Sequence, residues 1–167
     1  RPQSAGSDKI NVMKLNFVRK FNTGIYPYST MMSSFQPISE KPESPTIKAS
    51  FSAQEWCGQT YLQLNQETSY DYQYKGFSYF ESEGDMEGKL KGVYLEDGLW
   101  NLLRIQPDAL PLGNIKILPG AQFLRLRHQP LKGYVAQAQL KTTEGGKMEY
   151  SIVYNDINRS VRILFEK

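Results

Sequence analysis

The chain has 167 residues, with 20 basic and 17 acidic side chains and a formal net charge of +3. That length suits one ordinary domain, which can bury roughly two-thirds of its unfolded surface, and an aromatic fraction of 13% argues against a disordered chain. No basic run accompanies the small charge, which argues against nucleic-acid binding, and no run of about 18 apolar residues is present to form a membrane-spanning helix.

The N-terminal part predicts a polar lead followed by strands. Residues 1–8 contain Pro, Gly and Ser, so we expect a linker there, and we expect residues 9–167 to form a single β-rich domain that is a segment of a longer protein. Strand-like alternation runs through residues 10–21 and 25–38, on either side of an Asn-Thr-Gly turn. Because proline donates no hydrogen bond to a neighbouring strand, Pro27 indicates an edge strand or the entry to a strand.

Extended structure is expected to continue through the middle of the chain. A polar loop with two prolines, residues 39–45, leads into a long extended stretch over residues 46–65. Gly58 lies inside this stretch and is expected to break or bulge it. Residues 70–90 again alternate like a strand and are rich in tyrosine.

The apolar pattern then changes to that of a helix. Three leucines recur at the i, i+3 and i+4 spacing of one helical stripe. Asp97 is expected to be the N-cap, and Pro107 is expected to stop the helix. The sequence therefore predicts one short helix near residues 97–105.

The C-terminal part predicts five further strands, at residues 115–118, 122–129, 133–142, 148–155 and 160–167. Short joints rich in turn formers favour hairpins, above all around Gly145-Gly146 and Asn155-Asp156, whereas parallel crossovers need about a dozen residues or more. The predicted fold class is mainly β (α+β): a twisted antiparallel sheet, or an open barrel or sandwich, with one short helix near residues 97–105.

Cys57 and His128 are the single Cys and the single His of the chain, and they are the weak candidates for a catalytic dyad. On the expected strand, His128 shares a face with Leu124 and Leu126, where an imidazole could meet a buried thiol. A thiol with an ordinary pKa of about 8.5 needs such a base to act as a nucleophile. The favoured alternative is a buried, inert Cys57 and a hydrogen-bonded core His128. No residue is therefore predicted to be catalytic.

Aromatic and basic side chains supply the candidate binding residues. Tyrosines at alternate positions share one face of a strand and suit contact with a sugar, a peptide or a partner, although cross-strand packing is an alternative. A pair of arginines on one strand face could hold an acidic group or could simply be solvated. The candidate ligand-binding residues are Tyr70, Tyr72, Tyr74, Trp56, Arg125 and Arg127.

The sequence predicts no metal site and no cofactor. One Cys and one His supply too few ligands for zinc. The acidic residues 81–88 lack the ligand spacing of a calcium loop, so we interpret them as a solvated turn. The chain also contains no phosphate-binding loop, nucleophile elbow or dinucleotide fingerprint. These observations lower the expectation of an enzyme.

Five ordered motifs resemble a known family: KFNTGIYPYSTMMSSFQPI, QEWCGQTYLQLN, SYFESEGD, LEDGLWNLLRIQPDALPLG and RLRHQPLKGY. They look like an uncharacterised family of cell-envelope proteins from Bacteroidetes-type bacteria, many of which look like lipoproteins. The similarity runs from about Lys14 to the C-terminus. It implies an exported protein, in the periplasm or at the outer membrane, that a lipid outside these residues tethers to the membrane. It brings no catalytic assignment to this chain.

Some members of that family carry the label "septum formation inhibitor Maf". The Maf nucleotide pyrophosphatases have an N-terminal Ser-Pro-Arg-Arg motif in an α/β fold. The one Ser-Pro pair here, Ser44-Pro45, is followed by Thr46 and Ile47 in a β-rich chain. The sequence therefore lacks the Maf motif, and we expect no nucleotide hydrolysis by this chain.

Three hypotheses for function follow. The first is a non-catalytic envelope domain that binds a ligand or an envelope partner through an aromatic sheet face. The second is a thiol-dependent hydrolase or transferase with Cys57 as nucleophile and His128 as base. The third is a carrier of hydrophobic molecules, because a curved antiparallel sheet can enclose acyl chains. The sequence favours the first.

Overall fold

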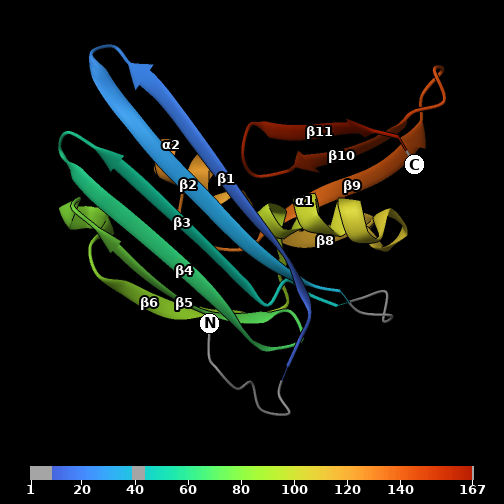
Figure 1. Ribbon diagram of the computed structural model, residues 1–167, viewed down its shortest axis with the longest axis horizontal. Helices are drawn as coiled ribbons and strands as arrows, with labels where there is room; N and C mark the ends of the chain where they lie inside the picture. The colour runs from blue at the N-terminus through green and yellow to red at the C-terminus, as the bar shows by residue number, and fades with distance from the viewer. Residues whose placement is uncertain (1–8, 39–43, 167) are drawn as a thin grey trace.

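Two twisted sheets make up most of the molecule, and the larger of them curves into a half-barrel (Figure 1). The computed structural model describes residues 9–38 and 44–166. The expected linker at residues 1–8, residues 39–43 of the expected polar loop and Lys167 lie outside the described residues. The prediction of a mainly β fold is confirmed.

The larger sheet has six strands in chain order, each antiparallel to the next. They are β1 (Val12–Thr23), β2 (Tyr26–Pro37), β3 (Lys48–Glu55), β4 (Gly58–Thr68), β5 (Asp71–Ser78) and β6 (Met86–Leu90). Alternation along each strand decides which side chains are buried: Met32 and Phe51 lie on the concave face and are buried, whereas Met31 on the convex face is exposed. Pro27 was predicted to lie in an edge strand or at the entry to a strand, and it lies at the entry to β2.

The smaller sheet has five strands in the order β11-β10-β9-β8-β7. They are β7 (Tyr94–Leu95), β8 (Gly113–Leu118), β9 (Tyr134–Thr142), β10 (Met148–Tyr154) and β11 (Arg159–Phe165). The two predicted hairpins join β9 to β10 and β10 to β11 and are confirmed. The β7–β8 pair is parallel, which the sequence did not predict, and the helix α1 lies in the connection between these two strands.

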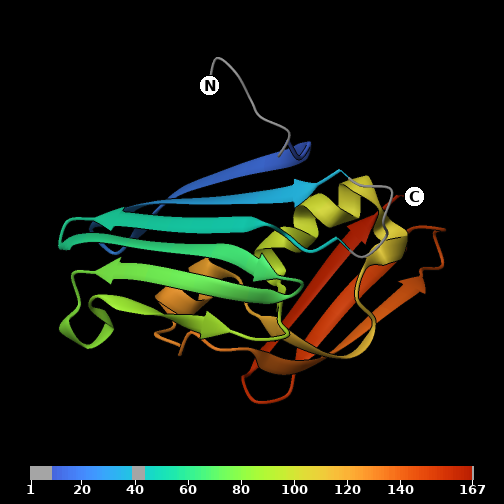
Figure 2. The same cartoon turned by 90° about the horizontal axis from the view of Figure 1, so that it is seen from below.

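Helix α1 (Glu96–Ile105) lies between the two sheets in both views (Figures 1 and 2). Leu99 is buried in a core to which both sheets contribute, so the predicted leucine stripe faces the interior. The buried amide Nδ2 of Asn101 donates to the main-chain oxygens of Met13 and Ser34, both at 3.2 Å. These bonds fix α1 to β1 and β2, because a buried amide without partners would destabilise the fold.

The predicted helix limits are partly right. Helix α1 ends at Ile105, and a 3₁₀ turn, η2 (Pro107–Ala109), begins at the proline that was predicted to stop it. The prediction of Asp97 as N-cap is wrong, because Leu95 occupies that position and provides no side-chain cap. Asp97 lies in the first turn and accepts a hydrogen bond from the backbone N–H of Ala121 at 3.0 Å.

A second helix, α2 (Ala121–Leu126), occupies the place of the strand predicted at residues 122–129, so that prediction is wrong. Ala121 and Leu124 are buried three residues apart, as on one side of a helix, whereas Leu126 is exposed. The expected strand face shared by His128, Leu124 and Leu126 therefore does not exist. His128 follows the helix in the left-handed region, with φ 48°.

The long stretch predicted at residues 46–65 is a hairpin of β3 and β4, joined by the two-residue turn Trp56-Cys57. The predicted break at Gly58 is confirmed. Its φ of +156° suits glycine, and a Cβ at this position would lie 2.7 Å from the ring of Tyr79. The turn exposes Cys57, so the expected burial of that thiol is wrong.

A buried ionic cluster lies where α1, α2 and the smaller sheet meet. The Glu96 carboxylate accepts hydrogen bonds from the hydroxyl of Tyr154 and from the guanidinium of Arg159. Arg159 also stacks over Phe123, with Cζ 4.1 Å from the ring centre. The partly buried Asp97 adjoins this cluster, so two carboxylates and one cation lie close together where these elements meet.

Candidate functional site

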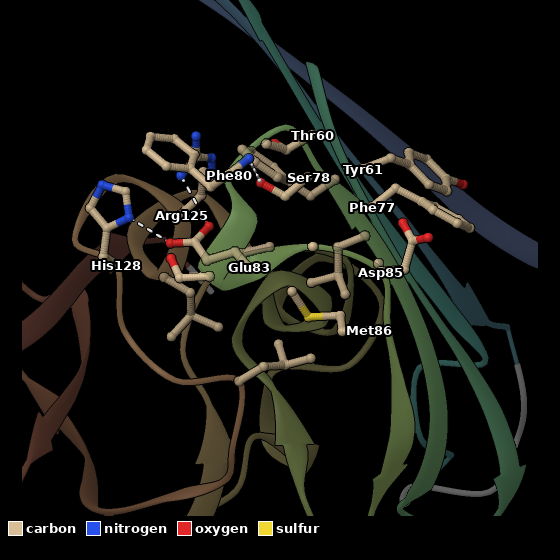
Figure 3. Close-up of a pocket in the computed structure, with 18 of the residues that line it drawn as sticks. Thr60, Tyr61, Phe77, Ser78, Phe80, Glu83, Asp85, Met86, Arg125 and His128 are labelled. Carbon is tan, nitrogen blue, oxygen red and sulfur yellow. Dashed lines mark hydrogen bonds and ion pairs between the residues drawn. The ribbon is translucent and has the colours of Figure 1, made fainter. Parts of the chain in front are cut away.

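A pocket of about 900 Å³ lies between the concave face of the six-stranded sheet and α2 (Figure 3). Strands β3 to β6 form one wall, α2 and the loop after it form the other, and the 3₁₀ turn η1 (Glu81–Glu83) borders it. Apolar side chains line much of it: Phe51, Leu62, Met86, Leu124 and Leu131. The pocket has the size and the mostly apolar lining typical of small-molecule sites.

An ion cluster on the edge of the pocket holds η1 against α2. Figure 3 shows Glu83 between Arg125 and His128. Its Oε2 lies 3.1 Å from Arg125 Nη1, and its Oε1 lies 2.5 Å from His128 Nδ1. Arg125 is only 12% exposed, so water screens its pairing with Glu83 less than it would at the surface. The segment interpreted as a solvated acidic turn therefore contains a half-buried carboxylate with two partners.

An aromatic ring reinforces the same cluster. The guanidinium carbon of Arg125 lies 4.4 Å from the ring centre of Phe80, and the rings of Phe80 and His128 meet edge to face at 5.2 Å. A cation over an aromatic face and an edge-to-face pair are both favourable contacts. Together they hold the cationic side chain at a fixed place beside the pocket.

Thr60 brings a hydroxyl without a partner to the pocket wall. Its side chain is only 7% exposed, and among residues 9–38 and 44–166 no group hydrogen-bonds to its Oγ1. The neighbouring Ser78 is paired with it across the sheet, and its own Oγ accepts a bond from the N–H of Phe80 at 3.2 Å. A buried hydroxyl without a partner costs about 1–3 kcal/mol.

Two exposed acids, Glu81 and Asp85, also line the pocket beside Glu83. The lining thus includes three acids, one arginine and one histidine. In the described part of the chain no three His, Cys, Asp or Glu side chains are arranged to hold a metal ion. The site consequently offers charged groups for a ligand rather than a ligand set for a metal.

The structure does not bring the two candidates for a dyad together. Cys57 is exposed in the β3–β4 turn, and its backbone N–H donates to Oε2 of Glu55 at 2.9 Å. Desolvation and the Glu55 carboxylate raise the pKa of the Cys57 thiol. His128 instead pairs with Glu83. A raised pKa is the opposite of what a thiol nucleophile requires.

The predicted binding residues fall into separate places. Tyr72 is buried, and its hydroxyl donates to the main-chain oxygen of Thr46 at 2.9 Å. Tyr74 lines the pocket, while Tyr70 packs against Tyr94 with ring centres 4.6 Å apart. The three tyrosines therefore do not form one exposed ladder.

The remaining three candidates, Trp56, Arg125 and Arg127, also separate. Trp56 is 67% exposed at the tip of a hairpin, where its ring contacts that of Tyr26. Arg125 borders the pocket, and Arg127 is exposed just after α2. Because a helix replaces the predicted strand, the two arginines do not share a strand face.

Sequence reasoning did not identify Glu83, Thr60 and Phe80 as site residues. No local pattern marks them, since the pocket exists only where η1 folds against α2 across 42 residues of sequence. The Pro119-Gly120 pair before α2 was the one available signal, because proline and glycine often precede a change of element.

None of the helices in residues 9–38 and 44–166 is long and apolar enough to cross a membrane.

Comparisons with known proteins give this chain no relative. No known family model, no curated protein and no solved structure matches the chain.

Proposed function

We propose that the protein is a non-catalytic binding domain that takes a small amphipathic molecule into the pocket between α2 and the half-barrel. The apolar part of the ligand would lie against Leu62, Met86 and Leu124, and its polar part would face the ion cluster. The observation that carries this proposal is a pocket of about 900 Å³ with apolar walls and charged groups at one side. The proposal joins two of the hypotheses drawn from the sequence: a binding domain that uses a sheet face, and a carrier of hydrophobic molecules.

The size of the pocket sets the expected affinity. A ligand of about 20 non-hydrogen atoms that gains about 0.3 kcal/mol per atom binds with about 6 kcal/mol. That free energy corresponds to a dissociation constant of tens of micromolar. Such an affinity suits a domain that takes up and releases its ligand.

The thiol-dependent enzyme is the less supported alternative. The thiol of Cys57 has a raised pKa, and its charged neighbour is the acid Glu55 rather than the imidazole of His128. A thiol whose pKa is raised remains mostly protonated at neutral pH. The cell envelope is proposed as the location on the family resemblance alone.

Replacing Met86 with tryptophan is expected to weaken binding of a fluorescent amphiphile, such as a dansylated undecanoic acid, at least tenfold. Met86 points into the pocket from β6, and an indole there would occupy the space of the apolar part of the ligand. A tenfold loss corresponds to about 1.4 kcal/mol. Fluorescence titration measures the dissociation constant.

The control is Glu87→Trp, on the next residue of β6, whose side chain is exposed on the other face. This variant adds the same indole outside the pocket and is expected to leave the dissociation constant unchanged. Equal binding by Met86→Trp and the unaltered protein, with both folded by circular dichroism, would contradict the proposal.

Replacing Thr60 with valine is expected to stabilise the protein by about 1 kcal/mol. Valine fills the same volume but removes a buried hydroxyl that has no partner in the described residues. Urea denaturation measures the change in the free energy of unfolding.

Thr46→Val is the matched control for the stability effect. The buried Thr46 Oγ1 donates to Oε1 of Gln36 at 2.8 Å, so valine there removes a satisfied bond and leaves an acceptor unpaired. We expect this variant to be less stable by about 1–2 kcal/mol. Opposite signs at the two threonines would support an unpaired buried hydroxyl at Thr60, and a loss of stability at both would contradict it.

A further inference from the structure

Two neighbouring hairpin tips expose large apolar side chains at one end of the half-barrel. Ile25 in the β1–β2 turn is 73% exposed and Trp56 in the β3–β4 turn is 67% exposed, the highest values for large apolar residues in the described part of the chain. The ring of Tyr26 meets that of Trp56 edge to face at 5.6 Å, so the two tips touch. In Figure 1 the two turns extend from the same end of the sheet, in blue and in teal.

The first of these hairpins is purely basic. Residues 9–38 contain four cations, Lys9, Lys14, Arg19 and Lys20, and no Asp or Glu. Their charge of +4 exceeds the net charge of +3 of the whole chain. Arg19 and Lys20 are exposed a few residues from the tip, and the guanidinium of Arg19 lies 4.7 Å over the ring of Phe17.

Protection of an edge strand accounts for only part of this composition. Because β1 is the edge of the sheet, lysines on it discourage pairing with another chain. That role would be served by charge alone and does not account for Ile25 and Trp56 at the tips. The apolar tips and the cations behind them together fit one kind of surface, which has an apolar interior and an anionic outer layer.

We propose that the tips of the β1–β2 and β3–β4 hairpins dock the protein on an anionic lipid surface. Ile25 and Trp56 enter the headgroup region, where tryptophan and tyrosine are favoured. Arg19 and Lys20 lie behind the tips on the edge strand β1, and each cation near such a surface strengthens binding about fivefold. This docking does not depend on ligand binding in the pocket.

The arrangement also gives the docked protein an orientation. The acids Glu81 and Asp85 lie beyond β5, four strands from the basic edge strand β1. Repulsion of these acids from anionic lipid favours an orientation in which the β1 edge of the sheet, rather than the opposite edge, faces the surface. The pocket lies at the same end of the sheet as the hairpin tips. Thr60 in its wall follows soon after the β3–β4 turn, and its cross-strand partner Ser78 lies just before η1.

The single cysteine provides the test, because Cys57 is exposed beside Trp56 at the tip. The protein labelled at Cys57 with an environment-sensitive dye is mixed with vesicles of phosphatidylcholine and phosphatidylglycerol in equal parts, or of phosphatidylcholine alone. We expect a blue shift of the dye and co-sedimentation with the anionic vesicles. Binding to the neutral vesicles is expected to be at least tenfold weaker.

Two variants separate the charges from the apolar tip. Arg19→Gln with Lys20→Gln is expected to weaken binding to the anionic vesicles about thirtyfold, because two cations each contribute about fivefold. Ile25→Ser with Trp56→Ser is expected to abolish the blue shift of the Cys57 dye, so that its emission with anionic vesicles equals its emission in buffer. Leu164→Ser, at a side chain 56% exposed on β11 in the smaller sheet, is the control and should bind unchanged.

Other occupants of this surface would give different results. A dye on Glu144→Cys in a Cys57→Ser background, at the β9–β10 turn, should show no shift. Equal binding to both vesicle types, no shift at Cys57, or an equal loss in the Leu164 control would overturn the proposal. Binding of an oligonucleotide that Arg19→Gln with Lys20→Gln abolishes, without binding to vesicles, would assign the basic hairpin to nucleic acid instead.

Discussion

At pH 8, replacing Asp97 with asparagine is expected to raise the free energy of unfolding by about 2 kcal/mol, whereas at pH 5 the gain should be less than about 1 kcal/mol. Burial raises the pKa of Asp97 to about 7, and the charge of Glu96 adds to this. The N–H of Ala121 and the guanidinium of Arg159 act in the opposite direction but do not cancel it. Asparagine has the shape of the protonated acid and no charge to desolvate.

The sign follows from proton binding in the two states. Unfolded Asp97 has its ordinary pKa of 3.8, so between about pH 4 and pH 7 the folded protein holds a proton that the unfolded chain has lost. Raising the pH through this interval therefore favours unfolding. The full difference of about three pKa units would correspond to about 4 kcal/mol, and we expect about half because Asp97 is only partly buried.

Urea denaturation followed by far-ultraviolet circular dichroism at pH 5, 6, 7 and 8 measures this effect. Glu144→Gln removes a carboxylate from the exposed β9–β10 turn and is the control for loss of surface charge. It should change the free energy of unfolding by less than about 0.5 kcal/mol at each pH. Parallel stability curves for Asp97→Asn and the unaltered protein between pH 5 and pH 8 would show that Asp97 does not titrate in this interval.

Most of the fold follows from local patterns in the sequence. Alternation with period two predicts the strands because one face of each sheet packs on the core, as the buried Met32 and Phe51 beside the exposed Met31 show. Short joints rich in turn-forming residues predict the hairpins around Gly145 and Asn155, because such residues favour tight turns.

The segment at residues 121–126 resisted prediction because its apolar residues fit two periods. Leu124 and Leu126, with Arg125 between them, alternate as in a strand, whereas Ala121 and Leu124 fit one turn of a helix. Packing of Ala121 against the concave face of the larger sheet favours the helix. Tertiary contacts decide such short segments, and local propensity does not.

The candidate site depends on contacts between segments that are distant in sequence. Glu83 gains its role only when η1 meets Arg125 of α2, and Thr60 becomes an unpaired buried hydroxyl only when the pocket closes around it. Cys57 was conspicuous as the single cysteine, yet a two-residue turn exposes it away from His128. The single Cys and the single His stood out in the composition, but the reactivity of a side chain depends on its surroundings and not on how rare its type is.

Replacing Gly98 with alanine is expected to lower the free energy of unfolding by about 3 kcal/mol. Gly98 lies in the first half of α1, where it packs against the chain at Thr46. A Cβ there would overlap the Thr46 hydroxyl and lie 2.9 Å from its Cβ, so α1 would have to shift away from the sheet. Thermal and urea denaturation of the variant measure the loss.

The sign of this effect decides between helix propensity and packing. Propensity alone predicts that alanine stabilises the helix by about 1 kcal/mol, whereas overpacking predicts a loss. Gly145→Ala, in an exposed turn where a Cβ would meet nothing within 4 Å, is the control and should change stability by less than about 0.5 kcal/mol. If the clash is the cause, Gly98→Ala should cost less relative to a Thr46→Ala parent than relative to the unaltered protein, since that parent lacks the overlapping hydroxyl. A gain in stability for Gly98→Ala would mean that α1 can move from the sheet without cost, and that Asn101 does not fix its position.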